Sequence, residues 1–117
     1  MVTEFGKYIR KLRIENTVTL RAMADEVGKS PSYLSSVETG KRTITKDFFC
    51  SIARYFKLGQ EQEKDLRHLA DISQSEISMS LKEATLEQRN SAVVFARQLN
   101  SLTDDELKKI DDILEGL

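Results

Sequence analysis

The chain has 117 residues, of which 39% are hydrophobic and 32% are charged, and its formal net charge at pH 7 is −1. One Pro and five Gly are its only helix breakers, and no apolar run approaches the roughly 20 residues of a membrane-spanning helix, so we expect a helix-rich globular protein without membrane contact. A single cysteine excludes an internal disulfide and a Cys-based zinc cluster, and residues 1–10 have no apolar signal core, which together favour a reducing, cytoplasmic location.

Charge is unevenly distributed along the chain. Residues 1–59 carry 11 Lys and Arg against 6 Asp and Glu, whereas residues 60–117 carry 7 against 13. A basic half favours contact with a polyanion such as nucleic acid. The acidic half is expected to do something else.

Apolar side chains recur every three or four residues through most of the first 72 residues. This period predicts five helices, over residues 3–15, 20–27, 31–39, 46–56 and 60–72. Gly28 ends the second helix, Ser30 can cap the third, and Pro31 takes the first helical position, where a missing N–H is harmless. Because only two or three residues separate these two helices, they have the spacing of a helix-turn-helix.

The pattern changes at Ser73. Ile77, Met79 and Leu81 alternate with polar residues, which predicts a short strand. A strand needs a pairing partner, and nothing else in the chain has a strand pattern. Either this strand pairs with the same strand of a second chain around a two-fold axis, or the segment is an extended linker.

Two further helices are predicted after this segment, over residues 86–101 and 104–114, and each follows a Thr with the capping-box pattern. They are either an extension packed on the first five helices or an arm that docks on its counterpart in a homodimer. The apolar residues expected at such a dimer contact are Ile77, Met79, Leu81, Val93, Phe95, Leu99, Leu107 and Ile110. The predicted fold is thus all-α, with a five-helix domain at residues 1–72 and a strand–helix–helix extension at residues 73–117.

The third helix is unusual in its exposed hydroxyl groups. Its segment, SPSYLSSVETGKR, has only two aliphatic side chains, Leu34 and Val37, which are three residues apart and would face the core. The small polar residues on the opposite face can approach base edges in the major groove of DNA. Lys41 and Arg42 just beyond the helix suit backbone phosphates.

Residues 5–58 resemble the helix-turn-helix family of phage lambda-type repressors and Cro, also called the Xre family. The segments that carry the resemblance are FGKYIRKLR, MADEVGKSPSYLSSVETGKR and SIARYFKL. The resemblance implies a five-helix DNA-binding domain whose second and third helices form the motif. It also implies a salt bridge between Arg13 and Glu38 that ties the first helix to the end of the third.

The same resemblance assigns DNA contacts residue by residue. Among the base-facing positions are Pro31, Ser32, Ser35 and Ser36, of which Ser35 lies at the periphery. The positions that it places near phosphate are Thr19, Thr39, Lys41 and Arg42, and Tyr33 either contacts phosphate or a peripheral base or packs as a half-buried aromatic beside Leu34. Arg21 and Lys29 are also expected to contact phosphate. The sequence departs from the family pattern at Leu20, where many members have a Gln that braces a phosphate, and at Arg21, where Glu is common.

No catalytic, metal or cofactor site is predicted. His68 is the only histidine, and no second His or Cys accompanies it. The serines have no neighbouring general base, and no Gly-rich phosphate loop follows a strand. We therefore expect a protein that is not an enzyme and needs no cofactor.

The sequence predicts a cytoplasmic, homodimeric transcriptional regulator that binds double-stranded DNA. A repressor is favoured, with half-sites of an inverted repeat about one helical turn apart. One alternative is an antitoxin that binds its own operator and masks a toxin protein with its acidic half. Another is an interaction module whose helix-turn-helix no longer binds DNA.

Overall fold

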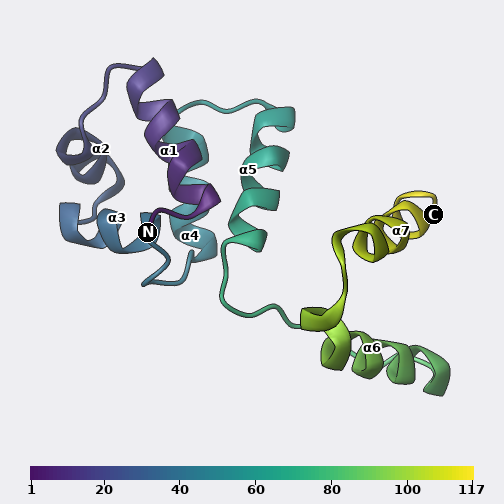
Figure 1. The fold of residues 1–117 in the computed structure, drawn as a ribbon. Coiled ribbons are helices and arrows are strands. Elements are labelled where there is room, and N and C mark those ends of the chain that lie inside the picture. The colour runs from purple at the N-terminus through teal and green to yellow at the C-terminus, as the bar shows by residue number, and fades with distance from the viewer. The chain divides into compact units, whose positions relative to one another are not determined.

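A computed structural model describes all of residues 1–117 and contains helices but no strand (Figure 1). It divides into two compact units, Met1–Ile77 and Ser78–Leu117. The helices of the first unit are α1 (Glu4–Glu15), α2 (Leu20–Val27), α3 (Pro31–Glu38), α4 (Lys46–Tyr55) and α5 (Gln60–Ile72). Those of the second are α6 (Leu86–Gln98), the short 3-10 helix η1 (Leu99–Ser101) and α7 (Asp104–Glu115).

Side-chain hydroxyl groups begin most helices of the N-terminal unit. The residues that cap α1, α2, α3 and α4 in this way are Thr3, Thr19, Ser30 and Thr45. Each accepts the backbone N–H three residues further on, which satisfies a donor that the first turn of a helix leaves free. Local sequence therefore sets where these helices start.

A single apolar core holds the N-terminal unit together. Helix α1 packs against α3 and α5, and α2 packs against α3 and α4. Every one of the five helices contributes to the core, whose buried members are Phe5, Ile9, Leu12, Met23, Ala24, Leu34, Val37, Phe48, Phe49, Ile52, Leu66 and Ala70. The five helices and their order agree with the sequence prediction to within one or two residues at each end.

The prediction of a strand at Ile77–Leu81 is wrong. Residues 76–80 have no regular secondary structure, and the chain turns at 82–83, where the Ala84 N–H donates to the Leu81 carbonyl at 3.1 Å. The guanidinium of Arg89 also donates to the carbonyl oxygens of Leu81 and Ala84, which ties the segment to the start of α6. Alternating polarity over six residues is too short a signal to make a ladder when the chain offers no second strand.

The C-terminal unit has no core of its own. Neither α6 nor α7 has a buried residue, although both begin at a capping box formed by a Thr and a Gln or Glu three residues later. The α-helical part of α6 ends at Gln98, and η1 completes the helix that the sequence predicts through residue 101. None of the helices has the length and apolar character required to cross a membrane.

Candidate nucleic-acid interface

A three-residue turn, Gly28 to Ser30, joins α2 to α3 and sets the direction of α3. Gly28 has a φ of 70°, in the left-handed region, and the Lys29 N–H donates to the Ala24 carbonyl at 2.9 Å. A Cβ at Gly28 would meet no atom within 4 Å, so this position needs glycine for its backbone conformation and not for space. The Ser30 hydroxyl then accepts the Tyr33 N–H at 3.0 Å and begins α3.

Helix α3 has one buried and one exposed face. Leu34 and Val37 are each 1% exposed and fix the helix to the core. The opposite face carries the four residues predicted to face bases: Pro31, Ser32 and Ser35 are exposed, and Ser36 is half-buried. None of these side chains is longer than a hydroxymethyl group or a proline ring, so the backbone of α3 can approach a surface closely. A face this narrow fits the major groove, which is about 12 Å wide.

The loop after α3 folds back onto the end of the helix. The N–H groups of Lys41 and Arg42 both donate to the Ser36 carbonyl, at 2.9 and 3.2 Å. The Thr39 hydroxyl donates to the Ser35 carbonyl at 2.9 Å, and Gly40 allows the bend with a φ of 79°. Two cationic residues are thereby held just beyond the C-terminus of α3, where the helix dipole favours positive charge.

Unpaired positive charge surrounds the exposed face of α3. The exposed cations predicted to meet phosphates are Arg21, Lys29, Lys41 and Arg42. None of them lies within 4.0 Å of a carboxylate. The five ion pairs of the chain all involve other lysines and arginines. Thr19, the remaining predicted contact on α2, is exposed and caps that helix through the Ala22 N–H. Cations without acidic partners are free to neutralise phosphates.

A buried carboxylate anchors the end of α3 to α1. Glu38 is 3% exposed, and its Oε2 lies 3.1 Å from Nη2 of Arg13, the partner that the family resemblance implies. The N–H and hydroxyl of Thr3 also donate to the Glu38 carbonyl, at 3.0 and 3.1 Å. A Cβ at Gly6 would overlap that same carbonyl, so α1 approaches α3 closely. These contacts hold α3 rigidly at the surface.

Sequence reasoning missed a second arginine in this anchor. Arg10 Nε donates to Glu38 Oε1 at 2.9 Å, so one carboxylate holds two guanidinium groups. Arg10 and Arg13 are three residues apart on α1, and this spacing places them on the same face of a helix. The spacing of Arg10 and Arg13 was therefore the signal in the sequence that could have identified Arg10 as a second partner of Glu38.

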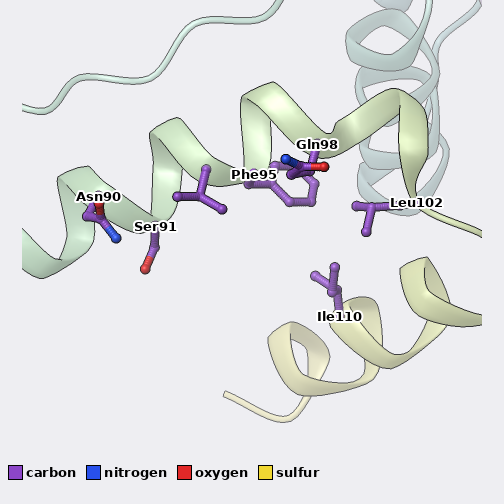
Figure 2. Close-up of a pocket in the computed structure, with 7 residues that line it drawn as sticks. Asn90, Ser91, Phe95, Gln98, Leu102 and Ile110 are labelled. Carbon is purple, nitrogen blue, oxygen red and sulfur yellow. The ribbon is translucent and has the colours of Figure 1, made fainter.

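Five of the eight residues predicted to form a dimer contact are exposed, and the other three are half-buried. Ile77 and Met79 are exposed and Leu81 is half-buried in the segment before α6. On the two C-terminal helices, the exposed members are Val93, Phe95 and Leu99, and the half-buried ones are Leu107 and Ile110. Residues of α6 and α7 line an open groove of about 360 Å³. Figure 2 shows Phe95 on α6 and Ile110 on α7 at opposite sides of it, with Leu102 at one end.

Comparison with known proteins supports the reading of the N-terminal unit. The family model described as Helix-turn-helix matches residues 9–59, a range that runs from within α1 to the residue before α5 and contains α2, the turn and α3. The match of residues 9–59 to the helix-turn-helix family, of the lambda-repressor and Xre type, supports a DNA-binding transcription regulator. No curated protein and no solved structure gave a match.

Proposed function

We propose that the chain is a sequence-specific repressor that inserts α3 into the major groove of double-stranded DNA. Pro31, Ser32, Ser35 and Ser36 would face base edges, and Ser hydroxyls and the proline ring would read them by hydrogen bonds and contacts with thymine methyl groups. Side chains with a bidentate match to one base are absent from α3, so water and DNA shape would contribute to the choice of sequence.

The observation that carries this proposal is the combination of a slim exposed face on α3 with unpaired cations at both of its ends. Lys29 precedes the helix, and Lys41 and Arg42 follow it. Phosphate contacts at both ends would fix the helix in the groove, and the residues between them would then approach the bases. The free thiol of Cys50 fits the reducing cytoplasm, where we propose that the protein acts.

We also propose that the regulator is a homodimer formed through α6 and α7. Val93, Val94 and Phe95 are consecutive and 40–46% exposed. Successive residues of a helix are about 100° apart, so these three side chains span more than half of its circumference. The single neighbour α7 cannot cover them all, and a helix that is apolar on several faces needs several neighbours.

Charge supports a second copy as the missing neighbour. Helix α6 has two arginines and one glutamate, whereas α7 has six acidic residues and two lysines. Packing α6 of each copy against α7 of the other would bring opposite charges together twice around a two-fold axis. A dimer of this kind would bind the two half-sites of an inverted repeat. If the partner is instead a basic toxin protein, the chain would be an antitoxin.

The DNA proposal can be tested with a charge placed on α3. A binding sequence is first selected from random duplexes, and the dissociation constant is then measured by fluorescence anisotropy. Ser32→Glu should weaken binding about 100-fold or more, because a carboxylate would face the phosphates and base edges. It should not unfold the protein, since negative charge in the first turn stabilises a helix.

The matched control is Ser75→Glu, which adds the same charge at an exposed position outside α3. It should change affinity less than threefold, as a surface charge away from the interface does. Equal losses in the two variants, or failure of the native chain to retain any duplex at low salt, would contradict the proposal.

A further inference from the structure

The ring of Tyr33 lies close to two of the cations that flank α3. Lys29 Nζ is 4.8 Å from the ring centroid, and Arg42 Cζ is 5.3 Å from it. Both distances lie within the roughly 6 Å over which an aromatic face attracts a cation. Lys29 belongs to the turn before α3 and Arg42 to the loop after it, so one aromatic ring gathers charges from both ends of the helix.

The ring itself is held in place by the core. Tyr33 is half-buried, and its ring meets that of Phe48 edge to face, with centroids 5.5 Å apart and planes at 68°. Phe48 is 3% exposed and belongs to α4. This arrangement is favourable for an aromatic pair, and it leaves the ring of Tyr33 little freedom to rotate.

Contact with the Tyr33 ring affects the conformational freedom that Lys29 and Arg42 lose when they bind phosphates. Lys and Arg side chains at a surface lose conformational freedom when they bind a phosphate, and this loss opposes binding. Contact with the ring restricts Lys29 and Arg42 before DNA arrives. Both cations lie close to the same ring, and neither forms an ion pair with a carboxylate, so an approaching phosphate would relieve their repulsion.

We infer that Tyr33 is a positioning residue for DNA binding, whose ring holds Lys29 and Arg42 ready to contact the phosphates at the two ends of α3. This inference rests on the proposed function and assigns the role to the aromatic ring and not to the hydroxyl. The competing explanation is a direct contact between the Tyr33 hydroxyl and a phosphate. The first explanation requires the aromatic ring, and the second requires the hydroxyl.

The test compares Tyr33→Phe with Tyr33→Leu in the full chain. The probe is a fluorescent duplex of arbitrary sequence and about 30 base pairs, roughly three helical turns. Affinity is measured across a series of salt concentrations. Tyr33→Phe keeps the ring and should match the native chain. Tyr33→Leu should weaken binding about 5- to 30-fold at low salt and make the logarithmic salt dependence shallower by about one to two units.

Tyr55 provides a matched control for loss of an aromatic pair. It is also half-buried, and its ring meets that of Phe56 edge to face at 4.9 Å and 68°, but no cation lies over it. Tyr55→Leu should lower the unfolding temperature without altering the salt dependence of binding. In a chain that carries Lys29→Gln and Arg42→Gln, adding Tyr33→Leu should have no further effect on that dependence.

An unchanged salt dependence in Tyr33→Leu would overturn the inference, and so would a loss in Tyr33→Phe as large as that in Tyr33→Leu. The second result would assign the role to the hydroxyl. Both outcomes leave the proposed function standing, because the native chain still binds. If the native chain itself retains no duplex at low salt, the proposed function fails and this inference fails with it.

Discussion

The two units of this protein are built from similar helices and differ in what those helices bury. In Met1–Ile77 every helix contributes to one apolar core, and in Ser78–Leu117 no residue is buried. Both units have helices that begin at a side-chain cap. Local signals therefore do not distinguish helices that build a buried core from helices that build none, because most helix stability comes from tertiary packing.

The comparison also separates two kinds of exposed surface. On α3 the exposed side chains are small and polar, and they stand over a rigid core. On α6 and α7 they include large apolar residues beside charged ones, with Ile113 69% exposed and Leu114 58% exposed. The first surface suits a polar ligand that must be approached closely. The second suits a protein surface that removes apolar area from water.

The largest expected difference between the two units comes from truncating one phenylalanine to alanine in each of them. Phe5 is 0% exposed and Phe95 is 40% exposed. Phe5→Ala should lower the free energy of unfolding of the N-terminal unit by about 3–5 kcal/mol, because it removes a buried ring and leaves a cavity. Phe95→Ala should leave that transition unchanged. Denaturant unfolding followed by circular dichroism measures both, and similar losses in the two variants would contradict the division into units.

The next effect tests the partner of the C-terminal unit. Phe95→Asp should raise the dissociation constant of the dimer at least about tenfold, or about 1.4 kcal/mol, because it places a carboxylate in an apolar contact. Asn100→Asp is the control, since it adds the same charge at an exposed residue of η1. Light scattering over a range of concentrations measures the association.

Two results would count against the dimer. One is a native chain that stays monomeric at every concentration, which would leave the apolar face of α6 and α7 to a different protein. The other is an equal weakening by Phe95→Asp and Asn100→Asp, which would mean that charge matters and apolar contact does not. Either result would leave the N-terminal unit and its DNA surface unaffected.

How far the sequence predicts this structure depends on the range of each interaction. Helix starts at Thr45, Thr85 and Thr103 were predictable because a cap involves residues only three apart. The buried face of α3 followed in the same way from the spacing of Leu34 and Val37. A strand also depends on a distant partner, and the strand expected at Ile77–Leu81 is absent because the chain has no second strand to pair with it.

The features that the sequence did not reveal depend on the path of a loop or on contacts between distant elements. Arg42 meets the ring of Tyr33 because the loop after α3 folds back through its bonds to Ser36. Arg10 shares Glu38 with Arg13 because α1 lies close to the end of α3. Neither arrangement follows from helical periodicity alone. The base and phosphate contacts assigned to α3 remain predictions.

The smallest expected effect concerns a cap in the unit without a core. Glu106 accepts hydrogen bonds from the N–H of Thr103 at 2.9 Å and from its hydroxyl at 3.1 Å, and these bonds lower the pKa of the Glu106 carboxyl below its ordinary value. A pKa that is lower in the folded state stabilises that state above the unfolded pKa. This contribution is lost as pH falls through the folded pKa.

Helix α7 should therefore fray at its N-terminus in acid, on the low side of the roughly 4.3 at which a free Glu titrates. The amide resonance of Thr103, followed by NMR against pH, measures the change. Glu106→Gln is the matched variant, because a Gln can accept the same bonds and cannot titrate. Its Thr103 resonance should stay constant over the range where the native one shifts. A native Thr103 resonance that does not move would show that the cap is not formed in solution. The start of α1 in the other unit should not respond to this pH change, because it is capped by the hydroxyl of Thr3, which does not titrate.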